Sequence, residues 1–190
     1  STNPLCKGQA VGTVVSDNVL VRNGVFSNGH AGSVGYSAQG GGDNYGYYAS
    51  FDATNENGTT PNNFLNHRSG RVNFTWIATP KISVDASVAV ARIDDKLPKG
   101  DQDTYGFLLG GDFGSPASVI AGPNGGLAGG WFTATESVAS ISAINTEDNT
   151  LRATPSVQLH YSPVSWFSNR LTFGQDFTHT LATQLYPKNN

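Results

Sequence analysis

The chain has 190 residues, a net charge of −3 and a low charged fraction of 13%, while apolar residues make up 37%. This composition excludes a disordered acidic or basic tail, and the slight negative charge provides no basic surface for nucleic acid or an anionic membrane. No apolar run approaches the roughly 18 residues of a transmembrane helix, so residence in a membrane requires β-strands. We expect a single domain over residues 1–190.

Two features concern the ends of the chain. The chain contains no methionine and begins with Ser1, which predicts a processed piece or an internal piece of a longer precursor. The single cysteine, Cys6, has no partner for an internal disulfide and follows no apolar signal segment. We therefore expect a free thiol there rather than a lipid anchor.

Apolar and polar residues alternate along several segments, which is typical of strands with one apolar and one polar face. Residues 10–27 have room for one or two strands. In chain order, the alternation then follows in the segments 32–39, 45–54, 71–76, 82–90, 156–161 and 166–178. The polar positions carry mainly Ser, Thr, Gly, Asn and Gln instead of Lys, Glu and Arg. This composition predicts a polar face that contacts water but is sheltered from the bulk solvent.

Short and long connections alternate along the chain. The turns at 40–43, 79–81 and 162–165 are short, whereas the loops 55–65 and 93–149 are long. Alternate connections of an antiparallel meander lie at the same end of the sheet, so we expect every short turn at one end and every long loop at the other. Outer-membrane β-barrels have this asymmetry, and strands of about nine to twelve residues suffice to cross the hydrocarbon core.

These patterns predict an all-β fold, an antiparallel meander of about six to nine strands that forms an open or partial barrel-like sheet. One short helix is expected near residues 135–145. Thr135 is a suitable N-cap there, and Val138, Ile141 and Ile144 recur every three residues.

Aromatic residues near the ends of strands are candidates for contact with a partner. Trp166 and Phe167 directly follow a short turn, where an interfacial girdle places aromatic rings. The alternative is that they plug the core of a β-sandwich. Trp131 and Phe132 end a glycine-rich stretch suited to contact with a partner or ligand, and the alternative is that their rings cover an apolar face of the sheet.

One acidic stretch has nearly the spacing of a calcium-binding loop. Asp101, Asp103 and Asp112 match positions one, three and twelve of such a loop, and Gly106 matches position six. However, Tyr105 occupies position five, and Asp112 is shorter than the usual bidentate Glu. We therefore favour a solvated polar loop as the interpretation.

Other chemistry is not indicated. Asp52 and Asp85 lie on polar strand faces, where we interpret them as wall residues and not as a catalytic pair. No nucleophile elbow or phosphate-binding glycine motif is present. The four histidines lack acidic or cysteine neighbours at zinc-ligand spacing: His30, His67, His160 and His179. The sequence predicts no enzyme, no cofactor and no metal.

Three stretches resemble the barrel of TonB-dependent outer-membrane transporters, particularly the SusC-like branch. They are 40–50 with its continuation to 74, 135–154, and 161–176, of which the last is similar to a family hairpin ending in a Gly-x-Asp strand. The resemblance implies a role in nutrient uptake. Such transporters have a barrel of about 22 strands around a plug. This chain lacks the plug, a TonB-contacting segment and most of the strands, so the comparison implies an internal fragment.

A fragment of this size leaves two open sheet edges, which lipid does not tolerate. We therefore expect other protein chains, or the remainder of a barrel, along those edges. The expected location is the bacterial cell envelope, either in the outer membrane or at the periplasmic face of a membrane complex. Two alternatives stay open. The first alternative is an accessory β-sheet subunit that stabilises a larger membrane complex, for example a photosynthetic or respiratory one. The second alternative is a soluble β-sandwich that binds a small molecule or glycan.

Overall fold

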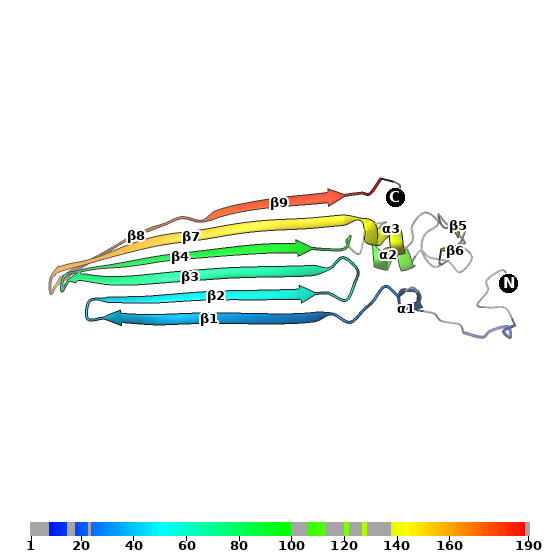
Figure 1. The fold of residues 1–190 in the computed structure, drawn as a ribbon, viewed down its shortest axis with the longest axis horizontal. Coiled ribbons are helices and arrows are strands. Elements are labelled where there is room, and N and C mark those ends of the chain that lie inside the picture. The colour runs from blue at the N-terminus through cyan, green and yellow to red at the C-terminus, as the bar shows by residue number, and fades with distance from the viewer. Residues whose placement is uncertain are drawn as a thin grey trace.

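The computed structural model describes residues 8–14, 18–22, 24–99, 106–112, 120–121, 127–128 and 138–188. Long antiparallel strands dominate it (Figure 1): β1 (His30–Gly42), β2 (Tyr45–Asn57), β3 (Phe64–Thr79), β4 (Ile82–Lys96), β7 (Asn145–Val164), β8 (Phe167–Gly174) and β9 (Phe177–Leu185). The remaining elements are short: α1 (Val19–Arg22), α2 (Phe107–Asp112), β5 (Ile120–Ala121), β6 (Leu127–Ala128) and α3 (Val138–Ala143).

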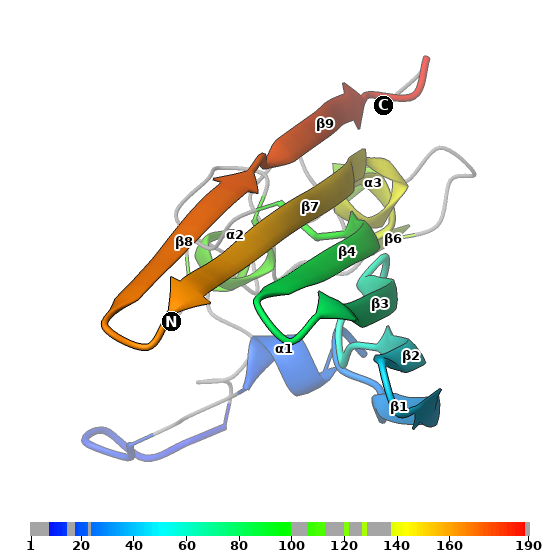
Figure 2. The ribbon, with the colours of Figure 1, turned by 90° about the vertical axis from the view of Figure 1, so that its left-hand side faces the viewer.

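The long strands form one open sheet in the order β1-β2-β3-β4-β7-β8, and β9 also pairs with β7. All of these pairings are antiparallel. Figure 2 looks along the strands and shows them as a single layer. The structure thus confirms the predicted all-β antiparallel meander.

Strands β8 and β9 occupy one edge position of the sheet. Ser156 of β7 faces Gly174 of β8, and Ala153 of β7 faces Phe177 of β9. Two residues separate these pairs on β7, and two residues separate them on the edge strand. The pairing register is therefore the same for β8 and β9. The sheet therefore has six strand positions, and its two edges, β1 and β8–β9, run in opposite directions.

Pro155 of β7 accounts for the interruption between β8 and β9. Its carbonyl accepts the backbone N–H of Gln175 at 3.0 Å. The N–H and C=O of a strand residue point to the same neighbour, and proline has no N–H, so the missing donor faces the edge strand. Toward the interior, Pro155 faces Val88 of β4 in a pair that needs no hydrogen bond. The proline therefore removes one hydrogen bond at the edge and none between β4 and β7.

The two ends of the sheet differ as the connection lengths predict. Two-residue turns at 43–44, 80–81 and 165–166 lie together at one end, on the left of Figure 1. The connection 58–63 lies at the other end, where β4 also ends at Lys96 and β7 begins at Asn145. We call these the turn end and the loop end.

The strand register separates the side chains into two faces, because residues directly opposite each other in antiparallel strands share a face. The first, which we call the apolar face, carries Val34, Tyr36, Tyr45, Tyr47, Phe51, Val72, Phe74, Trp76, Val84, Val88, Val90, Leu151, Val157, Leu159, Leu171, Phe173 and Phe177. The second, the polar face, carries the alternate residues, including Ser37, Ser50, Asp52, Arg71, Asp85, Ser87, Arg152, Thr154, Gln158, Thr172 and Thr178.

On the apolar face we call the uncharged part the apolar band. On β4 it runs over 82–90, and on β7 over 151–161, without any Asp, Glu, Lys or Arg at the apolar-face positions. Charged residues appear on this face only at the loop-end margin of the band, where Arg92 is directly opposite Leu151, and beyond it: Arg68, Arg92, Asp94, Lys96 and Glu147. Most large side chains of the band are exposed, from 37% for Leu159 to 71% for Tyr36 and Phe173, whereas Ile82 and Val84 are half-buried. No described element covers them.

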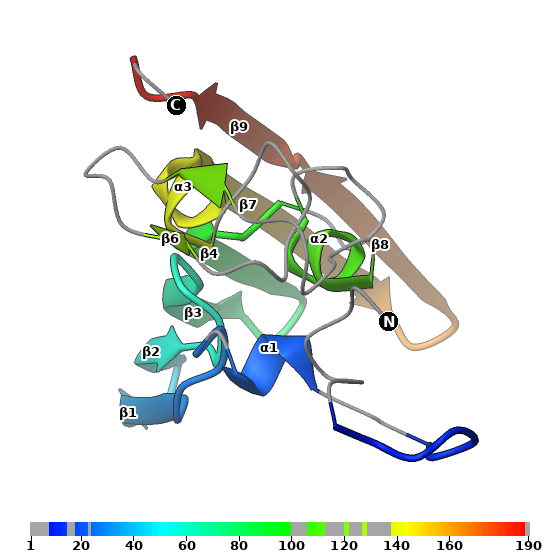
Figure 3. The same cartoon turned by 90° about the vertical axis from the view of Figure 1, so that its right-hand side faces the viewer.

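The buried apolar residues of the described chain lie elsewhere. Val25, Phe107 and Ile141 form a small core at the loop end, with Leu20 and Val138 packed against it; we call these five residues the loop-end cluster. They come from α1 and the segment after it, from α2 and from α3, which Figure 3 shows in front of the strand ends. Among the described residues, no helix is long and apolar enough to cross a membrane.

The structure also corrects several details of the sequence prediction. The strands β1 to β4 and β7 have 13 to 20 residues and extend past the apolar band, because their polar loop-end halves also pair. The described residues of 10–27 contain no strand, and α1 lies there instead. The predicted helix is present as α3, while α1 and α2 are too short for periodicity to reveal. Thr135 lies outside the described residues.

Candidate functional site

The polar face is the surface on which the structure gathers chemically active side chains. Many of its hydroxyl and amide groups bond across the strands, since directly opposite positions bring short polar side chains together. These cross-strand pairs are Ser87–Ser156 at 3.1 Å, Gln158–Thr172 at 2.8 Å, Thr150–Thr180 at 3.0 Å and Thr146–Gln184 at 3.0 Å. These pairs satisfy part of the hydrogen-bonding capacity of the polar face without external ligands.

One polar cluster near the turn end contains a histidine and a carboxylate. Thr75 Oγ1 donates to Asp85 Oδ1 at 2.7 Å. His160 Nε2 lies 3.2 Å from Asp85 Oδ2 and 2.9 Å from Gln158 Oε1. Asp85 is therefore a hydrogen-bonded residue of the polar face, as the alternation predicts. Its contact with His160 joins β4 to β7 and could not be recognised from spacing within the sequence.

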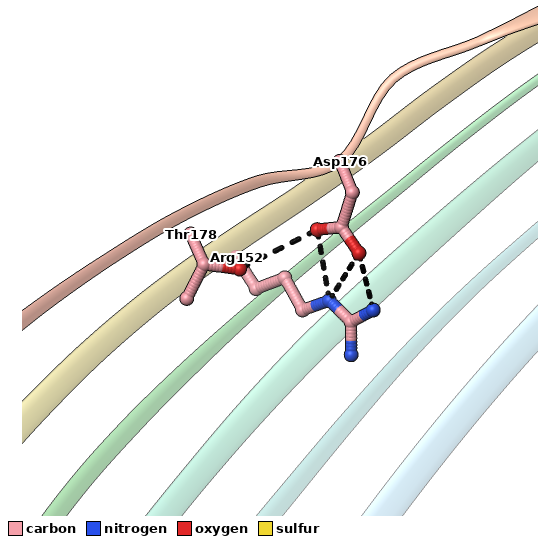
Figure 4. A network of polar contacts seen from close by, with 3 residues as sticks. All are labelled: Arg152, Asp176 and Thr178. Atoms are coloured by element: carbon pink, nitrogen blue, oxygen red, sulfur yellow. Dashed lines mark hydrogen bonds and ion pairs between the residues drawn. The ribbon is translucent and has the colours of Figure 1, made fainter.

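A second polar cluster lies where β8 gives way to β9 (Figure 4). Arg152 Nε lies 3.0 and 3.1 Å from the two carboxylate oxygens of Asp176, and Arg152 Nη2 also donates to Oδ2. Thr178 Oγ1 donates to Asp176 Oδ1 at 3.4 Å. The two-point contact of guanidinium and carboxylate is geometrically specific. It ties the edge strand to β7 beside the position where Pro155 interrupts the ladder.

A hollow of about 470 Å³ opens on the polar face next to this cluster. Its floor includes Ala89 and Ala91 of β4, which are small where neighbouring positions carry larger polar side chains. Arg71 of β3 lines one side and Arg152 of β7 lines the other. Hydroxyl groups and one carboxylate complete the lining: Ser50, Ser69, Thr154 and Asp52.

The carboxylate of Asp52 leans away from the middle of this hollow. A Cβ atom placed on Gly35, which is directly opposite on β1, would lie 2.6 Å from Asp52 Oδ1. The Asp52 carboxylate therefore lies over Gly35, on the β1 side. Through the register, Asp52 aligns with Ala91 of β4, which is roughly 20 Å along that strand from Asp85. The structure does not bring Asp52 and Asp85 together as a pair.

Two carboxylates do meet at the loop end. Asp95 of β4 is directly opposite Asp148 of β7, outside the span of the apolar band. Partial burial, together with the negative charge of Asp148, raises the pKa of Asp95. Within the described ranges, no group of three or more His, Cys, Asp or Glu side chains is placed to hold a metal ion.

The predicted calcium loop is described only in part. Asp112 is exposed at the end of α2, while Asp101, Asp103 and Tyr105 lie outside the described residues. Cys6, Trp131 and Phe132 also lie outside them. The predictions for these residues stay predictions.

The other predicted aromatic contacts are placed clearly. Trp166 is in the 165–166 turn and 83% exposed, and Phe167 begins β8. Their rings meet edge to face, with centroids 6.0 Å apart and an angle of 68°. Tyr45 and Trp76, directly opposite each other on the apolar face, lie at the same turn end. The turn end thus carries several large exposed aromatic rings.

The chain matches no protein-family model, no curated protein and no solved structure. The resemblance to TonB-dependent transporters stays a prediction, and the geometry must carry the functional argument.

The most specific contact of the site, Arg152 with Asp176, was missed in the sequence. These residues are 24 positions apart, so no local motif contains them. The short hairpin turn at 165–166 pairs β7 with β8, but the register shifts by one residue between Tyr161 and Val164, so counting outward from the turn alone would place Arg152 opposite His179. Beyond the shift, Arg152 is opposite Thr178 and diagonal to Asp176, which local sequence does not reveal.

Proposed function

We propose that the chain forms part of the wall of an outer-membrane β-barrel similar to the TonB-dependent, SusC-like nutrient transporters. In this proposal the apolar face contacts lipid and the polar face lines the interior. The observation that carries it is the uncharged, uncovered apolar band on one face of the sheet. A soluble sheet of this size would bury such a face against other elements.

The height of the band supports a position in lipid. The band covers nine residues on β4 (82–90) and eleven on β7 (151–161). At about 3.3 Å per residue, and with the tilt of roughly 40° found in membrane barrels, these lengths project to about 20–25 Å. The apolar band of outer-membrane barrels is about 25 Å tall. The aromatic residues at the turn end are in the position of an interfacial girdle.

The sheet edges support the same proposal. β1 contains no charged residue and no proline, and β9 contains no charged residue. Edge strands of soluble sheets are usually protected by lysine, proline, bulges or covering elements, because exposed edges promote aggregation. Edge β1 lacks charged residues, and on edge β8–β9 the charged residues are Arg170 and Asp176, so both edges are suited to further strands with the same alternation. Because the edges run in opposite directions, the addition of complete hairpins would keep the two outermost strands antiparallel to each other, as closure into an antiparallel barrel requires.

The test compares neighbouring residues on opposite faces. Val88→Cys lies in the apolar band and Ala89→Cys lies on the polar face, so the two variants are matched in strand and depth. A Cys6→Ser background removes the native thiol. In the native assembly reconstituted into vesicles, brominated lipid should quench a fluorophore on residue 88 but not on residue 89. A water-soluble maleimide should react with residue 89 and not with residue 88. Equal behaviour at both positions would contradict the proposed wall.

A second candidate is an accessory sheet that covers apolar surface of a larger membrane-protein complex. The observation that favours it is the open sheet of six strand positions, which the described residues do not close. In that case a label on residue 88 would be shielded from both lipid and water. The intact mass of the polypeptide in its source, about 20 kDa or far larger, separates the two candidates further, since 20.0 kDa is the mass of this chain alone.

A further inference from the structure

We propose that the hollow on the polar face is a binding subsite for the carboxylate group of a small solute, with Arg71 and Arg152 as its cationic ligands. This inference rests on the proposed function in one respect, namely that the polar face is in contact with water and solutes. It adds the chemical class of solute that this part of the wall recognises.

The strand geometry brings the two arginines to a common ligand position. Arg71 is in register with Ala89 of β4, and Arg152 is in register with Ala91. The two arginines are two strands apart across the sheet and are offset by two residues along the strands. Their Cα atoms are therefore about 12 Å apart. Two arginine side chains can bridge that distance through one carboxylate. The side chains of Ala89 and Ala91 leave the space between them open.

Both arginines have donors available for a ligand. Among the described residues, Arg71 has no hydrogen bond or ion pair with another side chain. Arg152 is held by Asp176, but that contact uses Nε and Nη2, and the guanidinium has five N–H donors in total. A carboxylate matches the fork of a guanidinium group with two parallel hydrogen bonds. Asp176 therefore fixes the orientation of Arg152 (Figure 4) and leaves part of its fork free.

Asp52 adjusts the affinity of this subsite. Its carboxylate lines the hollow and repels an anion, although it leans toward Gly35 on β1. With Asp176 paired to Arg152, the charges of Arg71, Arg152, Asp52 and Asp176 cancel, so a bound carboxylate is held by the directed N–H donors of the two arginines and not by an excess of positive charge. Partial repulsion keeps binding weak, which a site on a passage requires because the solute must also leave.

The experiment titrates the purified native assembly with glutarate by calorimetry at low ionic strength. Arg71→Gln should weaken glutarate binding about tenfold or more, because it removes a charge-assisted contact. Asp52→Asn should tighten binding roughly threefold or more, because it removes a like charge. Damage to the fold cannot explain a gain in affinity, so the two variants together protect the test against misfolding. Glucose and ethanolammonium should not compete with glutarate.

Two arginine variants serve as matched controls. Arg68→Gln lies on the same strand as Arg71 but on the opposite face, and Arg170→Gln lies on the polar face outside the hollow. Both should bind glutarate like the wild type. The subsite is wrong if glutarate does not bind, if Arg71→Gln has no effect, or if the control variants weaken binding equally. The labelling of residues 88 and 89 tests the wall itself, so the two proposals can fail separately.

Discussion

The sheet and the loop-end cluster are stabilised in different ways. All four buried apolar residues of the described chain, Val25, Phe107, Ile141 and Ile144, lie outside the strands of the sheet. The sheet is held by its backbone ladders and cross-strand pairs, while its apolar face stays exposed. The comparison teaches that the cluster supplies its own apolar environment, whereas the described residues supply none for the apolar face of the sheet.

The strongest test of this difference places a charge on each face of β3. Val72→Arg puts a guanidinium in the apolar band, and Asn73→Arg puts one on the polar face. In the proposed bilayer, Val72→Arg should lower the free energy of unfolding by about 2–4 kcal/mol. Asn73→Arg should change it little, because the polar face is wet. Denaturant titration of the reconstituted assembly measures both values, and equal losses would show that the two faces have similar surroundings.

A substitution in the loop-end cluster should destabilise that cluster without destabilising the sheet. Ile141 is 2% exposed and belongs to the small core with Val25 and Phe107. Ile141→Ala should destabilise the cluster by about 2 kcal/mol or more, the lower end of the range for buried Ile to Ala. Hydrogen exchange should then accelerate in α3 but not in β3 or β4. Faster exchange throughout the sheet would show that cluster and sheet unfold as one unit.

A smaller effect is expected from pH at the loop end of the sheet. The pKa of Asp95 is raised above its ordinary value of 3.8, so the folded state holds this proton more tightly than the unfolded state. Stability from this group should therefore fall as pH rises from 3.8 through the folded-state pKa. Asp95→Asn should flatten that part of the pH profile of thermal unfolding. A steeper profile in the variant would contradict the assigned direction.

The smallest effect is expected at the junction of β8 and β9. Asp176→Asn removes the charge that holds Arg152, but the pair is exposed and contributes little to global stability. Amides near the junction should exchange faster, while the remaining ladders keep their protection. Asp94→Asn is the matched control, since it breaks the exposed pair with Arg92 inside the sheet. No change near 174–177 would show that the backbone alone holds the edge.

Much of the fold can be predicted from the sequence, because a strand with one apolar face has a local signature. The alternation in 45–54 and 82–90 identifies β2 and β4, and the short turns identify the hairpins. The loop-end halves of the strands lack this alternation, since polar residues occupy both faces there. Their extent depends on pairing with neighbours, which local patterns do not encode.

The site is less predictable for the same reason. Asp85 can be assigned to the polar wall from parity alone, but its neighbour His160 comes from a strand beyond a long loop. The hollow has Arg71 and Arg152 on its two sides, separated by two alanines of the strand between them. Such a constellation requires the register of three strands at once, so no single segment contains its signal.

The opposite directions of the two sheet edges have a consequence for how a protein of this kind can change over evolution. Inserting or deleting one strand would reverse the direction of every strand that follows and exchange the positions of its tight turns and long loops. Inserting or deleting a complete hairpin preserves both. Relatives of this chain should therefore differ in size by pairs of strands, and variation in connection length should collect on one side of the sheet.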